Sequence, residues 1–256
     1  MIDLQLQGLR AVVTGATGGI GNAIAEKLAL EGCALTLVAR DPPALDREAA
    51  RLGALASGAP VATIAADLGR PEDIARVAVS LENADILVNA AGAVPRGQLL
   101  DTTAEAFRWG MAVKGFGTID LCREAFRHMK ARRRGVILNI IGNSGQRPNP
   151  KSVGTSTVNA ALIAFTEAVG SISPDDNVRV LGINPGLVAT PRTAGLLQAS
   201  ADPNDLAYTH LTRDLPFGRM ARPEEIADFA AFLVSARAGY CSGSVYTIDG
   251  GARLRV

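Results

Sequence analysis

The sequence predicts an α/β protein with one seven-stranded parallel sheet and helices on both faces of that sheet. Short apolar runs alternate with longer helical patterns along all 256 residues, which is typical of strands joined by crossover helices. Neither a linker nor a repeat interrupts this alternation. We therefore expect residues 1–256 to form a single domain.

The expected strands are short apolar runs, several of which end directly in glycine, proline or polar residues. In chain order they are 9–14, 34–39, 61–66, 86–88, 135–141, 178–183 and 244–248. A helix is expected after the first strand, because Ile20, Ile24 and Leu28 share one helical face. A long helix is expected over about 103–132, and Gly115 and Gly117 within it indicate close approach of another backbone.

Composition and charge favour a small-molecule ligand over nucleic acid or a membrane. The chain has 26 Lys and Arg against 25 Asp and Glu, so no overall field attracts a polyanion. Cys33, Cys122 and Cys241 lack metal-ligand spacing and indicate reduced thiols in a cytoplasmic protein. With only His128 and His210, a histidine-based metal site or a Ser-His-Asp triad is not expected. The N-terminus lacks an export signal, and no uncharged apolar run is long enough to span a membrane.

The sharpest local motif is TGATGGIG at residues 14–21, between the first strand and the first helix. Gly15 permits a tight turn, Gly19 permits close approach of a pyrophosphate, and Gly21 permits helix–strand packing. The helix N-terminus then faces the anion. Taken alone, the motif also fits an ordinary strand-to-helix turn.

Other motifs follow in a consistent order. NAAG occupies residues 89–92, Asp67 follows the third strand, NPG at 184–186 precedes Thr190, and RPEE and DGG occupy 222–225 and 249–251. With the glycine-rich loop, they make nearly the whole chain resemble the short-chain dehydrogenase/reductase family. That resemblance implies a Rossmann-type, doubly wound fold that binds a nicotinamide dinucleotide, unless the site is vestigial. The implied cofactor-binding residues are Gly15, Thr17, Gly19, Ile20, Arg40, Asp67, Leu68, Asn89, Ala90, Gly92, Asn159, Pro185, Gly186, Val188 and Thr190.

The end of the second strand favours NADP over NAD. An NAD enzyme needs an acidic side chain there for the adenosine ribose, and the residue at that position is Ala39. Nothing at that position repels a 2′-phosphate, and Arg40 offers it a planar set of donors. Alternatively, Arg40 is a solvated turn residue paired with Asp41.

The residues that perform proton chemistry in the family are replaced. The resemblance places Gly142, Thr155 and Asn159 at the usual serine, tyrosine and lysine positions, and Lys114 at the asparagine position. No Tyr-x-x-x-Lys occurs anywhere in the chain. Lysine and asparagine have exchanged places, which indicates a retained role for Lys114 and Asn159. The alternative is that Lys114 extends to solvent and Asn159 bonds local backbone.

Several groups are candidate proton donors. They are Lys114, Ser144 acting through a water, and Tyr208 or His210 in the segment 191–220, which resembles the family's substrate lid. Thr155 is a weaker candidate, because an alcohol is a far weaker acid than a phenol and a helical threonine often bonds a backbone carbonyl.

Three functions remain open. The first is an NADP(H)-dependent oxidoreductase acting on a carbonyl or alcohol, with Lys114 replacing the usual proton relay. The second is a non-redox enzyme that uses the same site, and the third is a nucleotide-binding sensor or partner subunit without chemistry. The family resemblance and the long helices also predict a homodimer or homotetramer. The sequence does not specify the substrate.

Overall fold

The computed structural model describes residues 3–56, 58–92, 94–194 and 215–255. Its sheet has seven parallel strands in the order β3-β2-β1-β4-β5-β6-β7. The strands are β1 Arg10–Thr14, β2 Ala34–Ala39, β3 Val61–Ala65, β4 Ile86–Asn89, β5 Gly135–Ile140, β6 Val178–Pro185 and β7 Val245–Ile248. The seven predicted strands are confirmed, with ends that differ by at most two residues.

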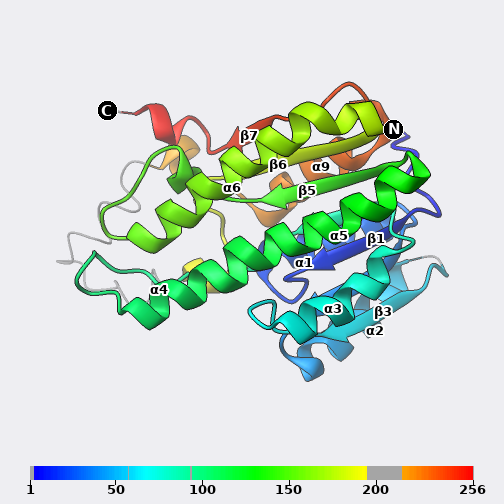
Figure 1. Ribbon diagram of the computed structural model, residues 1–256, viewed down its shortest axis with the longest axis horizontal. Helices are drawn as coiled ribbons and strands as arrows, with labels where there is room; N and C mark the ends of the chain where they lie inside the picture. The colour runs from blue at the N-terminus through cyan, green and yellow to red at the C-terminus, as the bar shows by residue number, and fades with distance from the viewer. Residues whose placement is uncertain (1–2, 57, 93, 195–214, 256) are drawn as a thin grey trace.

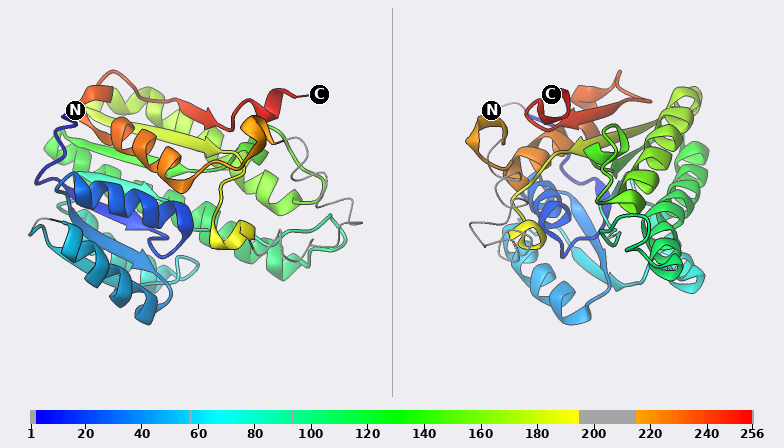
Figure 2. Two further views of the ribbon diagram at one scale, coloured as in Figure 1. Left: turned by 180° about the vertical axis from the view of Figure 1, so that it is seen from behind. Right: turned by 90° about the vertical axis from the view of Figure 1, so that its left-hand side faces the viewer.

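Helices lie on both faces of the sheet, as predicted. One face carries α1 Gly19–Leu30, α2 Pro42–Leu55 and α9 Pro223–Val234, seen from behind in Figure 2. The other face carries α3 Pro71–Leu81, α5 Gly117–Arg132 and α6 Val153–Ile172, which lie in front of the sheet in Figure 1. The parallel sheet is therefore covered on both sides, which explains its nearly continuous apolar strands.

The hydrophobic core has a layer on each side of the sheet. Ile24 and Leu28 of α1 are fully buried in one layer, and Ile20 packs against the same cluster. The predicted apolar stripe of α1 is thus confirmed. In the other layer, Leu81 of α3 and Leu121 of α5 are fully buried. Burying each such side chain contributes roughly 1.5–3 kcal/mol, so the two layers hold the strand ends in fixed positions.

The predicted long helix over about 103–132 is confirmed as an unbroken helical stretch over residues 104–132, of which the middle turn is π-helical. A short helix, α4 Ala104–Gly110, leads into a π-helical turn, η1 Met111–Phe116, before α5 begins. The predicted close approach is confirmed at Gly117, where an added Cβ would lie 2.6 Å from the Leu68 carbonyl oxygen. π-helical turns are frequent at functional sites, and this one carries Lys114.

The carboxyl ends of the strands meet at one edge of the sheet, on the left in Figure 1. The chain leaves β1 for β2 on one side and continues through β4 on the other, so the strand order reverses between β1 and β4. In sheets of this kind, ligands bind in the crevice outside that reversal point. None of the helices within the described ranges combines the length and hydropathy needed to cross a membrane.

Candidate active site

A cavity of about 620 Å³ lies at the carboxyl edge of the sheet. Its walls come from the ends of the seven strands, β1 to β7, and the segments that follow them. Most of the residues expected at the site line it, namely Gly15, Thr17, Gly19, Ile20, Arg40, Leu68, Ala90, Gly92, Lys114, Ser144, Thr155, Asn159, Pro185, Gly186, Val188 and Thr190. The fold thus brings together residues that are up to 175 positions apart.

Two expected cofactor-binding residues do not line the cavity. The Asp67 carboxylate accepts a hydrogen bond of 3.0 Å from the Gly69 amide and so shapes the turn after β3. Asn89 is buried, and its side chain donates to Asn139 Oδ1 at 3.0 Å. Both residues therefore make hydrogen bonds next to the cavity without lining it.

The glycine-rich loop depends on its glycines for close packing. Gly15 has a φ of 67°, and an added Cβ would lie 2.7 Å from the Ala90 carbonyl oxygen. An added Cβ on Gly19 would lie 2.5 Å from Thr190 Cγ2. Thr14 joins the two loops, because its hydroxyl oxygen accepts hydrogen bonds of 3.2 Å from the amides of Ala90 and Ala91. Larger residues would push these loops apart, so the crevice fits a dinucleotide whose diphosphate lies at the N-terminus of α1.

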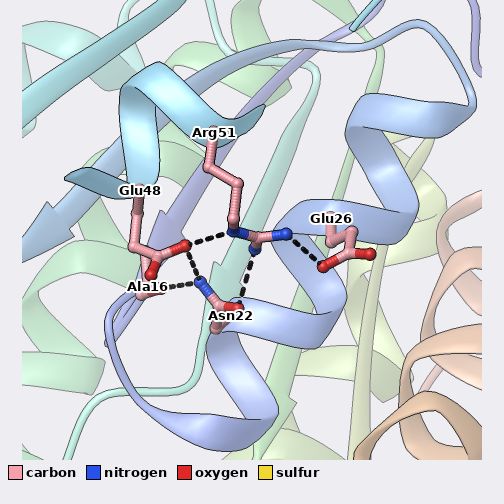
Figure 3. A network of polar contacts seen from close by, with 5 residues as sticks. All are labelled: Ala16, Asn22, Glu26, Glu48 and Arg51. Carbon is pink, nitrogen blue, oxygen red and sulfur yellow. Dashed lines mark hydrogen bonds and ion pairs between the residues drawn. The ribbon is translucent and has the colours of Figure 1, made fainter. Parts of the chain in front are cut away.

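A polar network fastens the glycine-rich loop to α2 (Figure 3). The Asn22 amide donates to the Ala16 carbonyl at 3.1 Å and to Glu48 Oε2 at 2.8 Å. Arg51 donates to Glu48 at 2.8 Å, to Glu26 at 2.6 Å and to Asn22 Oδ1 at 3.0 Å. The loop is therefore held in place by side chains outside the cavity.

Arg40 lies at the end of the cavity formed by β2. Its guanidinium lies over the Trp109 ring, 5.7 Å from the ring centroid, as a cation–π pair. Asp41 instead accepts from the Ala44 amide and caps α2, so the expected alternative, an Arg40–Asp41 ion pair, is not formed. Trp109 also lines the cavity. The sequence analysis missed it, although it is the only tryptophan of the chain.

Lys114 is buried, and its Nζ donates a 2.6 Å hydrogen bond to the carbonyl oxygen of Ile141. Burial, together with the nearby charge of Arg192, lowers the pKa of Lys114 to about 7. The alternative in which this lysine extends to solvent is wrong. A buried amine with a near-neutral pKa can both donate and accept a proton at physiological pH.

Asn159 contacts the segment 141–144, to which Lys114 is also bonded. Its Nδ2 donates to Ser144 Oγ at 2.8 Å, whereas its buried Oδ1 has no hydrogen-bond partner among the described residues. The alternative in which Asn159 bonds local backbone is therefore wrong. Such an unpaired acceptor is costly unless a ligand donates to it, so Oδ1 fits a ribose hydroxyl. Thr157, one turn into α6, bonds the Val153 carbonyl at 3.0 Å, whereas Thr155 lines the cavity.

Gly142, which was predicted to occupy the serine position, has a backbone conformation that strains any side chain. Its φ is 133°, a value that favours glycine. An added Cβ would also lie 2.8 Å from Asn159 Nδ2. The Gly142 amide donates to Asn184 Oδ1 at 3.2 Å, which fixes this conformation. Gly142 and Asn159 therefore pack directly against each other.

We expect Gly142→Ser to lower the free energy of unfolding by about 2 kcal/mol, because a side chain at this φ is strained and meets Asn159. Urea unfolding measures the change. Gly53→Ser is the matched control, since an added Cβ there meets nothing within 4 Å. Equal stability of Gly142→Ser and the unaltered protein would contradict the steric argument.

Four basic side chains line the cavity, namely Arg40, Arg96, Lys114 and Arg192, and its described lining contains no Asp or Glu. The sequence analysis missed Arg96 and Arg192, since nothing in their local sequence links them to a site. Arg192 donates to the carbonyls of Gly92 and Val94, both at 3.4 Å. The cavity therefore suits an anionic ligand. Tyr208, His210 and most of the expected lid lie outside the described residues.

Comparison with known proteins gives consistent matches over the whole chain. A family model described as enoyl-(acyl carrier protein) reductase matches residues 15–253. Galactitol 2-dehydrogenase (L-tagatose-forming) of Cereibacter sphaeroides is 35% identical, over 96% of this chain and 96% of that protein. The uncharacterized short-chain type dehydrogenase/reductase y4vI of Sinorhizobium fredii is 34% identical over 98% of this chain. This chain spans 45% of that relative's length.

Solved structures agree with these matches. L-Sorbose reductase from Gluconobacter frateurii, complexed with NADPH and L-sorbose, has a TM-score of 0.91 and 32% identity, with 100% of both chains covered. YwfH, described as an NADPH dependent reductase involved in bacilysin biosynthesis, has a TM-score of 0.90 and 28% identity over 98% of this chain and all of that one. The motif order, the sheet and these matches lead to one conclusion: the chain belongs to the short-chain dehydrogenase/reductase family of oxidoreductases.

Proposed function

We propose that the protein is an NADP(H)-dependent oxidoreductase that interconverts a carbonyl compound and its alcohol, with Lys114 in place of the usual proton relay. The observation that carries this proposal is the buried Lys114 amine, which lies in the same cavity as the glycine-rich loop. The NADPH complex of the related L-sorbose reductase supports the choice of cofactor.

The residues of the cavity suit the parts of NADP in order. Arg40 would hold the 2′-phosphate, the N-terminus of α1 would face the diphosphate, and Asn159 Oδ1 would accept from the nicotinamide ribose. When bound, NADPH supplies the hydride for carbonyl reduction. The protein then has to orient the carbonyl, exclude water and provide one proton.

Lys114 would provide that proton. The Ile141 carbonyl accepts one hydrogen of its Nζ at 2.6 Å, which leaves the other hydrogens of the ammonium for a substrate oxygen. As the carbonyl becomes an alkoxide, the buried charge stabilises it and an N–H proton passes to it. The amine left behind regains a proton from solvent. The reverse reaction uses the neutral amine as the base.

Consumption of NADPH with a panel of ketones and aldehydes tests this function directly. We expect turnover with at least one of them, accompanied by formation of the alcohol. Tight NADPH binding without turnover would instead identify a nucleotide-binding sensor or partner subunit. A product formed without net oxidation of NADPH would identify a non-redox enzyme that uses the same site.

We expect Arg40→Ala to weaken NADPH binding about 10- to 100-fold, because charge-assisted hydrogen bonds to the 2′-phosphate are lost. NADH binding should change less than about 3-fold by the same reasoning. Titration of nucleotide fluorescence measures both, and Arg47→Ala on the exposed side of α2 is the matched control. NADH binding as tight as that of NADPH, and unaffected in Arg40→Ala, would overturn the cofactor assignment.

We also propose a homodimer or homotetramer in solution. This proposal rests on membership of the family and on the length of α5 and α6, two helices whose faces can pair between subunits. Sedimentation velocity at micromolar concentration should give a dimer or tetramer. A strictly monomeric species would contradict this proposal.

A further inference from the structure

The basic residues of the cavity occupy two separate places. Arg40 belongs to the end formed by β2, where it contacts Trp109. Arg96 belongs to the loop after β4, which is joined to the start of α6. The Gly97 amide donates to the Lys151 carbonyl at 3.1 Å, and the Val153 amide donates to the Gly97 carbonyl at 3.2 Å. Arg96 is thereby held at the end of α6 that carries Thr155.

Arg192, in the segment that follows β6, lines the same part of the cavity as Arg96. Its hydrogen bonds to the Gly92 and Val94 carbonyls are long, at 3.4 Å each, and therefore weak. Its charge lowers the pKa of Lys114, and burial together with the charge of Arg96 lowers the pKa of Arg192 itself. The three cations therefore lie close enough to repel one another.

No carboxylate in the described ranges forms an ion pair with Arg96, Lys114 or Arg192. Some arginines outside the cavity do form ion pairs, such as Arg51 with Glu26 and Glu48, and Arg219 with Glu225. Arg96 and Arg192 are exposed to solvent, and the described lining of the cavity offers these cations no carboxylate, so a ligand can neutralise their charge. The ligand that does so is an oxyanion, because guanidinium groups donate in a planar fork.

We propose that Arg96 and Arg192 form a carboxylate-binding subsite, so that the substrate is an oxo acid whose ketone reaches Lys114. This inference rests on the proposed function, because it assigns the substrate class of the same site. A carboxylate matches the planar guanidinium fork with two parallel hydrogen bonds. The diphosphate of the cofactor would lie at the N-terminus of α1.

The subsite can be tested by binding, without turnover. Trp109 is the only tryptophan and lines the cavity, so its fluorescence reports ligands of the NADP⁺-saturated protein. The probes are acetoacetate and levulinate, each compared with its neutral amide. We expect each acid to bind at least about 10-fold more tightly than its amide. Arg96→Gln/Arg192→Gln should abolish that preference and change NADP⁺ affinity less than about 3-fold.

A matched control is Arg237→Gln, since Arg237 bonds the Asp3 carbonyl at 2.9 Å, near the opposite edge of the sheet. It should retain the preference for the acids. Equal binding of acid and amide in both pairs would overturn the subsite. The subsite would also be overturned if the double variant kept the preference for the acids and its NADP⁺ affinity fell more than about 10-fold. That result would assign the arginines to the cofactor. Tighter binding of acetonylphosphonate than of acetoacetate would likewise overturn the carboxylate in favour of a phosphoryl group.

Combined with NADPH consumption on the carbonyl panel, this binding experiment separates the subsite from the proposed function. A preference for the acids without any NADPH oxidation would support the subsite and contradict the reductase. Reduction of neutral ketones, with no preference for acids and no effect of the double variant, would support the reductase and overturn the subsite.

Discussion

Lys114→Met is expected to abolish carbonyl reduction, with a loss in single-turnover rate of about 10²- to 10⁴-fold, the range for a missing general acid. Methionine has a similar length and no proton to donate. NADPH affinity should stay within about 3-fold, because Lys114 bonds the Ile141 carbonyl in the protein rather than depending on the nucleotide. Rapid mixing of the NADPH-bound variant with the substrate found in the carbonyl panel measures the rate.

Two further variants divide the roles within the site. Asn159→Ala should chiefly weaken NADPH binding, because its unpaired Oδ1 is the expected acceptor for the ribose. Thr155→Val should matter little for either binding or reduction. Unchanged rate and unchanged affinity in Lys114→Met would show that this lysine has only a structural role.

The pH dependence of the unaltered protein supplies an independent check on Lys114. Reduction needs the protonated amine, whose pKa is lowered to about 7. The single-turnover rate of reduction should therefore fall as the pH rises through about 7, and the rate of alcohol oxidation should rise over the same range. A reduction rate that stays level to pH 9 would contradict the assignment of Lys114 as the acid.

The second large effect is on stability: Lys114→Met should stabilise the cofactor-free protein, by up to about 5 kcal/mol below pH 7. The pKa of Lys114 falls from its ordinary 10.5 to about 7 in the folded protein. Between these values the unfolded chain binds more protons, so the unaltered protein becomes more stable as the pH rises. The advantage of the variant should therefore shrink above pH 7 and vanish above about 10.5.

Urea unfolding at pH 6 and at pH 10 measures this difference. Lys130→Met is the matched control, because Lys130 is an exposed lysine paired with Asp176 at 2.9 Å and exposed ion pairs contribute little. It should show no comparable gain at either pH. A Lys114→Met protein that is less stable than the unaltered protein at pH 6 would contradict an uncompensated buried charge at this position.

Local sequence patterns determined the framework of this protein. Strand runs such as 34–39 and 135–141 are continuous and apolar because both faces of the sheet are covered. The stripe of Ile20, Ile24 and Leu28 likewise identified the buried face of α1. Gly15 and Gly19 pointed to the dinucleotide crevice, because loop closure there leaves no room for a Cβ. The family resemblance also placed Lys114 and Asn159 at the usual asparagine and lysine positions, and this exchange stays a prediction.

Tertiary structure alone decided the chemistry of the site, because it depends on contacts between segments far apart in the chain. Lys114, whose pKa is lowered by burial, lies in a π-helical turn that the helical pattern over residues 103–132 did not indicate. The conformation of Gly142 is linked to Asn159, 17 residues later. Arg96 and Arg192 lie in unrelated loops and meet only where β4 and β6 end at the same edge. The pKa of an ionisable group depends on its desolvation and on nearby charges. Neither can be read from the neighbouring residues in the sequence.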